Sequence, residues 1–189
     1  MNELQCLIEF FNRYTILTPE DTDLLRGLVR FESYGRNEFV LSQHQVCNRI
    51  WFVKSGMLRK YHLSDGKEVT DWIHFENEMV TSMNSFFKGI VCNEFLQACE
   101  KCELISITRE NSEKLSGSLA FNVFNQKFLS EQLALLEISS SKSRLMDAKE
   151  KYEYLGKVAP QLIKRAKLGH IASIMGVTQE TLSRIRKQQ

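Results

Sequence analysis

The sequence predicts an α+β fold: an N-terminal antiparallel β-roll (jelly roll) with flanking helices, then a long dimerisation helix, then a small C-terminal helix-turn-helix domain. Short apolar or alternating runs, separated by turn residues, fill most of the first 110 residues, a pattern typical of a small antiparallel barrel or roll. Helical periodicity extends over residues 111–145, and two short helical patterns joined by a glycine close the chain. We therefore expect three parts, at residues 1–110, 111–145 and 146–189.

Two helices are predicted before the roll. Apolar residues at helical spacing indicate a short amphipathic helix over residues 4–11. Thr18 suits the N-cap of a second helix, because its hydroxyl can accept a hydrogen bond from a free amide of the first turn, and Pro19 suits the first helical position. Both helices are expected to support the roll.

Five strands are predicted from the apolar runs of the roll. They lie at residues 39–41, 50–53, 57–63, 69–75 and 104–107. The pair Asp65-Gly66 is a strong signal for a hairpin turn. The alternation breaks over residues 80–98, where residues 83–87 are predicted to form one helical turn, and a ligand pocket is expected at this interruption.

The long helix carries two apolar stripes. The first contains Phe121, Phe124, Phe128, Leu135 and Ile138, and the second contains Leu129, Leu133 and Leu136. A helix with two apolar faces has two surfaces to cover, one against its own roll and one against another copy of the chain. A homodimer with Phe128 and Leu135 in its seam is predicted, and a core helix packed wholly within the chain is the alternative.

The next segment leads to the C-terminal helices. A further helix is predicted from Met146 to Leu155, with Gly156 ending it, and Pro160 opens the connection that follows. The serine-rich stretch at 139–143 is a candidate hinge between the long helix and the C-terminal part.

Residues 168–187 give the most specific signal in the chain. Apolar residues on one face predict a short helix that ends near Met175, Gly176 suits a turn with positive φ, and Thr178 can cap the next helix. Leu182 and Ile185 form the apolar stripe of that second helix. The cap and the outward positions can meet bases or phosphate, and they are Thr178, Gln179, Glu180, Ser183, Arg184 and Lys187.

This arrangement predicts a helix-turn-helix whose second helix reads double-stranded DNA. An αα-hairpin that merely packs is the alternative, but such a hairpin has no need for a polar, arginine-bearing outer face. The charge distribution agrees with DNA binding, because residues 142–189 contain eleven Lys/Arg and four Asp/Glu, whereas the remainder contains 14 and 19. A polyanionic partner is therefore expected at the C-terminal end only.

Several classes of protein are disfavoured by the composition. The N-terminus has no basic signal region, and no apolar run approaches the roughly 18 residues that span a bilayer, so a cytoplasmic location without membrane contact is expected. An odd number of cysteines, five, argues for reduced thiols.

Metal and catalytic sites are not predicted. Cys99 and Cys102, three residues apart, would point to opposite faces of a strand, and the histidines show no ligand spacing, so that His170 is expected to face solvent or phosphate. Two isolated Ser-x-x-Lys matches without accompanying motifs are what chance supplies. We expect no catalytic residue, no metal and no cofactor.

The whole pattern resembles the Crp-Fnr family of bacterial transcription regulators. The resemblance rests on residues 50–56, 65–69 and 170–172, and most strongly on the run Thr178-Gln179-Glu180-Thr181-Leu182-Ser183-Arg184-Ile185-Arg186. It resembles in particular the branch common in Bacteroidetes, whose members carry a similar Glu-Thr-Leu-Ser-Arg-Ile-Arg run. The resemblance implies an effector-responsive regulator that binds an inverted-repeat operator as a homodimer, with base readout on Glu180 and Arg184. RNA polymerase is a further candidate partner.

The resemblance also places an effector pocket. Family members that bind cyclic AMP use a Gly-Glu-Leu segment and an Arg followed by Ser or Ala, and the corresponding positions here are Thr81, Ser82, Met83, Cys92 and Asn93. Neither the glutamate nor the arginine is present, so the pocket is expected to take an unknown small molecule other than cyclic AMP. The family's β-hairpin wing has no counterpart before the chain stops at Gln189, which implies weaker DNA binding.

A second class of function stays open, a small-molecule or redox sensor whose output is protein contact. The basic C-terminal segment with its recognition helix favours the DNA-binding regulator. A gel shift on the protein's own promoter region would separate the two.

Overall fold

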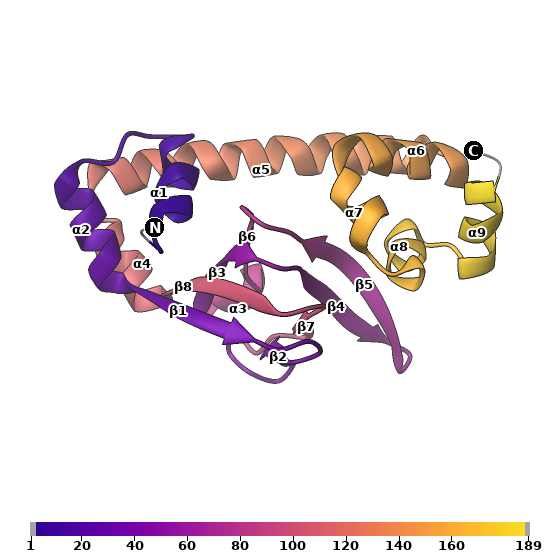
Figure 1. The fold of residues 1–189 in the computed structure, drawn as a ribbon, viewed down its shortest axis with the longest axis horizontal. Helices are drawn as coiled ribbons and strands as arrows, with labels where there is room; N and C mark the ends of the chain where they lie inside the picture. The colour runs from indigo at the N-terminus through magenta and orange to yellow at the C-terminus, as the bar shows by residue number, and fades with distance from the viewer. Residues whose placement is uncertain (1–2, 188–189) are drawn as a thin grey trace.

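Two four-stranded antiparallel sheets form the centre of the molecule (Figure 1). The computed structural model describes residues 3–187, without the side chains of residues 139–145. Sheet A contains, in spatial order, β1 (Val29–Tyr34), β8 (Cys102–Thr108), β3 (Arg49–Ser55) and β6 (Met79–Val80). Sheet B contains β2 (Phe39–Leu41), β7 (Glu94–Ala98), β4 (Leu58–Ser64) and β5 (Lys67–His74). The predicted antiparallel jelly roll is confirmed.

The hairpin between β4 and β5 forms where the sequence indicated it. Asp65 and Gly66 both have positive φ, 50° and 74°, and Ser64 pairs with Lys67 across the turn. This is the geometry that a two-residue hairpin requires, because its twist matches that of the flanking strands. Three strands were not predicted: β1, the two-residue β6 and β7.

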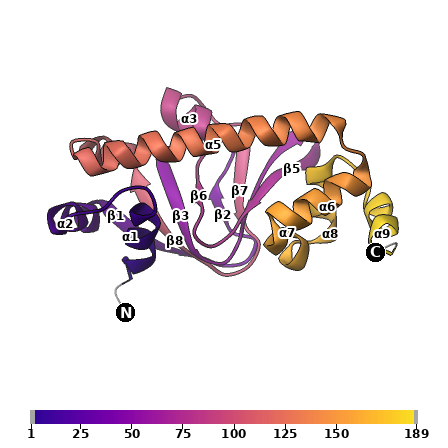
Figure 2. The ribbon, with the colours of Figure 1, turned by 90° about the horizontal axis from the view of Figure 1, so that it is seen from above.

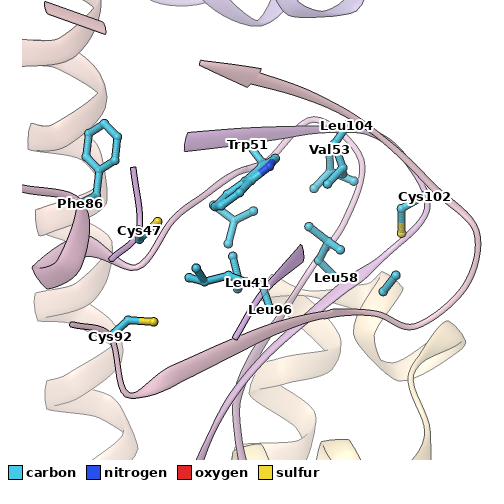
Figure 3. Close-up of a cluster of buried hydrophobic side chains, with 12 residues drawn as sticks. Leu41, Cys47, Trp51, Val53, Leu58, Phe86, Cys92, Leu96, Cys102 and Leu104 are labelled. Carbon is cyan, nitrogen blue, oxygen red and sulfur yellow. The ribbon is translucent and has the colours of Figure 1, made fainter. Parts of the chain in front are cut away.

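The space between the sheets is filled by alternate residues of the strands. Trp51, Val53, Leu58, Leu96 and Leu104 are buried there, and Figure 3 shows these side chains converging. Because strand side chains alternate, the neighbouring residues face outward and build two further cores on the outer faces of the sheets.

Gly56, between β3 and β4, occupies a position that only glycine fits. Its φ is +92°, and an added Cβ would come within 2.6 Å of the Lys101 carbonyl and 2.8 Å of the Cys102 Sγ. Its amide donates a hydrogen bond to Glu76 Oε1 at 2.9 Å. The tight turn at Gly56 therefore helps to hold the Glu76 carboxylate in place.

The N-terminal helices and part of the long helix cover sheet A. They are α1 (Gln5–Asn12), α2 (Pro19–Leu28), α4 (Arg109–Leu115) and α5 (Leu119–Leu145). The core beneath them is rich in aromatic rings, with Phe10, Phe11, Phe121 and Phe124 packed around Phe52 of β3. Thr18 caps α2, as the sequence predicted, and the Asp21 side chain accepts a hydrogen bond from the Thr18 amide in return.

The helix predicted over residues 111–145 is two helices. Residues 116–118 separate α4 from α5, and the Ser118 hydroxyl accepts a hydrogen bond from the Ala120 amide at the start of α5. α5 then runs along the molecule from the N-terminal helices to the C-terminal ones (Figures 1 and 2). The candidate hinge at 139–143 lies within α5, so the chain leaves the helix later, at Met146.

The C-terminal helices cover the outer face of sheet B. They are α6 (Ala148–Val158), α7 (Pro160–Arg165), α8 (Leu168–Met175) and α9 (Gln179–Lys187). The prediction that Gly156 ends α6 is wrong, since the helix continues to Val158. Nothing lies within 4 Å of where a Cβ at Gly156 would be. Met57, Ile73 and Phe75 of the roll share one buried cluster with residues of α6 to α9.

Two further predictions can be compared with the structure. The helical turn predicted at 83–87 is α3 (Met83–Lys88), ended by Gly89 with a φ of 68°. Within the described residues, none of the helices has both the length and the apolar composition to cross a membrane. The chain's end at Gln189, and with it the expected lack of a wing, lies outside the described residues.

Candidate nucleic-acid interface and ligand pocket

α8 and α9 are joined by a tight turn at residues 176–178. Gly176 has a φ of 68°, and the Val177 amide donates to the Ala172 carbonyl at 3.0 Å, which closes the end of α8. The Thr178 hydroxyl accepts a hydrogen bond from the Thr181 amide at 3.1 Å and so caps α9. Leu182 and Ile185 are buried in the cluster shared with sheet B. The turn and the cap predicted from the sequence are therefore present.

Most of the predicted DNA-contacting side chains are exposed on α9. Thr178, Glu180, Arg184 and Lys187 are exposed, whereas Ser183 is half-buried. Glu180 and Arg184 lie one turn apart, with Glu180 Oε1 3.9 Å from Arg184 Nη2. The two residues expected to read bases thus form a loose ion pair with each other, which solvent screens strongly.

Gln179 has an additional contact that the sequence did not reveal. An added Cβ on Gly169 of α8 would come within 2.7 Å of Gln179 Nε2. The amide group of Gln179 therefore lies against the backbone of α8, and the small size of Gly169 allows this approach. Arg186 is a further exposed cation in the last turn of α9, and it was not included in the predicted set.

Polar contacts attach the C-terminal helices to the roll. Arg165 of α7 donates two hydrogen bonds to the Glu76 carboxylate, at 2.6 and 3.0 Å, and a third to Glu100. The hydrogen bonds from Arg165 lower the pKa of Glu76, against the opposing effect of burial. The Thr70 amide, on edge strand β5, donates to the Ser173 hydroxyl of α8 at 2.8 Å.

His170 lies at the same junction and not in solvent as predicted. Its ring is half-buried, and its Nδ1 is buried without a hydrogen-bond partner among the described residues. Burial lowers the pKa of His170 to about 4, and the charges of Arg59 and Lys167 act in the same direction. At neutral pH the imidazole is therefore uncharged.

A cavity of about 690 Å³ opens at the inner face of sheet B, within the size range of small-molecule sites. It is lined by Gln43, Lys60, His62, Leu63, Asp71, Trp72, His74, Asn93 and Glu94. Of the five predicted effector residues, only Asn93 lies on this lining. Thr81, Ser82 and Cys92 are buried beside it and Met83 is 48% exposed on α3.

The charged residues of the cavity are paired with one another. Lys60 Nζ lies 3.1 Å from Glu94 Oε2, although without the alignment of a hydrogen bond, and donates to the Thr81 carbonyl at 3.4 Å. His62 Nδ1 lies 2.9 Å from Asp71 Oδ1. These residues were missed because strand alternation predicts which side chains face inward but not that the inner face is hollow at this point.

Four of the five cysteine thiols are shifted away from activation. Burial is the main cause that raises the pKa of the Cys6, Cys92 and Cys102 thiols, and it raises the pKa of Cys99 to about 11. Reactive thiols have the opposite shift. Among the residues that the structure describes, no three His, Cys, Asp or Glu side chains are grouped so that they could hold a metal ion.

Comparison with known proteins identifies the architecture. Residues 31–117 match the family model of the cyclic nucleotide-binding domain. Thermus thermophilus catabolite activator protein is similar in structure, with a TM-score of 0.57 and 18% identity over 91% of this chain and 83% of that one. The c-di-GMP-responsive global regulator CLP of Xanthomonas campestris has a TM-score of 0.67 and 15% identity, covering 90% and 91%.

A third solved structure comes from Eubacterium rectale and is assigned to the Crp/Fnr family of transcriptional regulators. It has a TM-score of 0.66 and 18% identity, over 91% of this chain and 83% of that one. The chain has a Crp-like fold. A comparison with curated protein sequences finds no match.

The Crp-like fold raises the question of whether this cavity fits a cyclic nucleotide. A cyclic phosphate needs an unpaired cation or several free amide donors in its pocket. Lys60 is the one Lys or Arg on the described lining, and Glu94 neutralises it, while Asp71 adds a further negative charge. The residues present do not fit an anionic phosphate, and they favour a neutral or positively charged molecule beside Trp72.

Proposed function

We infer that the protein is an effector-responsive, sequence-specific DNA-binding transcription regulator that acts as a homodimer. The observation that carries this proposal is the exposed α9, capped by Thr178 and held by Leu182 and Ile185, at the C-terminal end of a Crp-like fold. Glu180, Arg184 and Lys187 lie on its free side. No catalytic role is needed, and the roll serves as the sensor.

Each of the three parts of the chain then has its own role. Residues 1–110 sense the effector, the helix within 111–145 joins two copies, and residues 146–189 contact DNA. The run from Glu180 to Arg186 groups the protein with the Bacteroidetes branch of Crp-Fnr regulators, and RNA polymerase is the protein partner expected at a promoter.

The dimer is expected to form through the distal half of α5. Five of its apolar side chains are exposed in the single chain: Leu129, Leu133, Leu135, Leu136 and Ile138, at 44 to 67%. Phe128 does not belong to this surface, because its ring packs on Phe10, Tyr14 and Phe124. A contiguous exposed apolar strip on a helix is typical of an interaction surface.

The dimer predicts the form of the operator. If α9 enters the major groove, Arg184 can meet the O6 and N7 of guanine, and Glu180 can accept from the N4 amine of cytosine. Two copies related by a twofold axis require an inverted repeat, with half-site centres about 34 Å apart. Each half-site should therefore contain a G·C pair at a fixed position.

Selection of bound fragments from random DNA, followed by competition binding, tests the proposal. Arg184→Ala should lower the binding free energy by about 1 to 3 kcal/mol and relax the preference at one base pair. Lys187→Ala should weaken binding to all sequences alike and lower the slope of log affinity against log salt concentration by about one. If Arg184→Ala leaves the base preference unchanged, the assignment of α9 is wrong. If the selection yields no preferred DNA sequence, an output through protein contact is favoured.

The effector is expected to be a small molecule other than cyclic AMP. Titration calorimetry with cyclic AMP should detect no binding at micromolar concentration, because Lys60 is already paired with the Glu94 carboxylate. Glu94→Gln removes that competitor, so it should strengthen any residual cyclic AMP binding. A micromolar dissociation constant for the unchanged protein would contradict this reading of the cavity.

A further inference from the structure

A second cavity, of about 230 Å³, lies where the C-terminal helices meet the outer face of sheet B. The roll contributes Arg36, Met57 and Cys99 to its wall, and the C-terminal helices contribute Arg165, Lys167 and His170. In Figure 1 this junction lies between α7, α8 and the strands of sheet B. The cavity is separate from the one inside the roll, since the two share no lining residue.

The wall of this cavity is positively charged. Arg165 is paired with Glu76 and Glu100, and Glu100 is the one carboxylate on the described lining. Arg36 and Lys167, in contrast, have no carboxylate within ion-pair distance among the described residues, and both are exposed at the mouth. Two unpaired cations at one opening raise the local concentration of anions.

His170 supplies a second, independent observation. The residue lines the cavity, and its Nδ1, buried behind that wall, has no hydrogen-bond partner among the described residues. A buried polar atom without a partner is rare in native proteins and calls for a water or a ligand.

We propose that this junction cavity binds a small organic carboxylate and that the bound molecule holds the C-terminal helices against the roll. The carboxylate lies between Arg36, Lys167 and the His170 ring, and its apolar part lies on Met57 and Cys99. The cavity volume admits one ring or a short chain, because drug-sized ligands occupy about 300 to 1,000 Å³. The ligand contacts both parts of the chain, so its binding energy adds to their association.

Benzoate is a suitable probe, and benzamide is its uncharged match in shape. The chain of residues 1–189 carries ¹³C-methyl methionine and ¹³C-labelled histidine, and the signals of Met57 and His170 are assigned by Met57→Leu and His170→Gln. Benzoate should shift both signals saturably, with a dissociation constant of about 1 mM or lower. Benzamide should shift neither signal. Hydrogen exchange of the α8 amides should slow when benzoate is bound.

Two variants test the charge, and one serves as the control. Arg36→Gln and Lys167→Gln should each weaken benzoate binding about two- to fivefold, the range of exposed ion pairs, and the double variant should abolish saturation. Lys164→Gln removes an exposed charge from α7 outside the cavity and should leave the affinity unchanged. The proposal is overturned by equal shifts with benzamide, by no saturation, or by an equal effect of Lys164→Gln. The test uses no DNA, so its result is independent of the proposed function.

Discussion

The imidazole of His170 couples stability to pH. Its pKa is about 4 in the folded protein, lowered first by burial and then by Arg59 and Lys167, with Glu68 opposing them, whereas an unfolded histidine has a pKa of about 6.5. Between these values the unfolded chain binds more protons, so stability is fully present above about pH 6.5 and falls as the pH drops toward 4.

Thermal unfolding of His170→Gln should therefore depend less on pH than that of the wild-type protein between pH 6.5 and 4.5. The glutamine keeps a polar group at the junction and removes the titration. Circular dichroism melts at several pH values provide the measurement. Parallel curves for the two proteins would show that His170 is not buried as described.

The limits of sequence reasoning are clearest for single residues. Thr178 and Gly176 were predicted correctly, because capping and left-handed turns depend on a few neighbours in the chain. Lys60 and Glu94 are 34 positions apart, and they meet only because β4 and β7 pair in one register. The polar lining of the cavity therefore could not be read from local patterns.

At the scale of elements, α5 has two roles along its length. Its first turns bury Phe121 and Phe124 against α1 and sheet A. Farther on, where no part of the described chain covers it, Leu133 and Leu135 are 67% and 54% exposed. Periodicity predicted both apolar stripes but could not show that Phe128 faces inward, because that depends on where α1 packs.

Leu135→Glu should convert the dimer to a monomer while the fold persists. The twofold axis places two such charges in the seam, and the cost of at least about 2 kcal/mol raises the dissociation constant about thirtyfold. Ser130→Glu adds the same charge at an exposed position about 120° around the helix from Leu136 and is the matched control. Light scattering at micromolar concentration distinguishes them, and a wild-type monomer there would refute the dimer.

Strands and helix ends were predicted correctly where the signal is local and missed where it depends on packing. The hairpin at Asp65 and Gly66 was predicted because its signal is local. β7 was missed because Glu94–Ala98 mixes inward Leu96 with an outward ring, Phe95, which stacks on Tyr61. Gly156 was expected to end α6, but tertiary packing of Tyr152 and Leu155 outweighs the modest cost of one glycine in a helix.

For the whole molecule, Arg165 is the main polar link between the two ends. Arg165→Ala leaves the partly buried Glu100 carboxylate without its partner and leaves Glu76 with the Gly56 amide alone, which costs more than losing an exposed ion pair. The α8 amides should then exchange with deuterium about tenfold faster or more. Arg26→Ala, which breaks the exposed pair with Asp23 on α2, should leave them unchanged.

Arg165→Lys refines this test. Lysine keeps the positive charge but cannot bond both oxygens of Glu76 in a forked geometry, so α8 exchange should be intermediate. If both Arg165 variants match the wild-type protein, the apolar contacts of Ile73 and Phe75 alone hold the helices in place.

The cluster in which Met57, Ile73 and Phe75 meet the C-terminal helices also sets a rule for building hybrids of this protein. A C-terminal segment transplanted at residue 146 onto a different roll would leave behind the surface on which Ile171 and Leu162 are buried. A working hybrid must carry those three roll positions with the helices, together with Glu76, or the transplanted segment will lose the surface that its own core packs against.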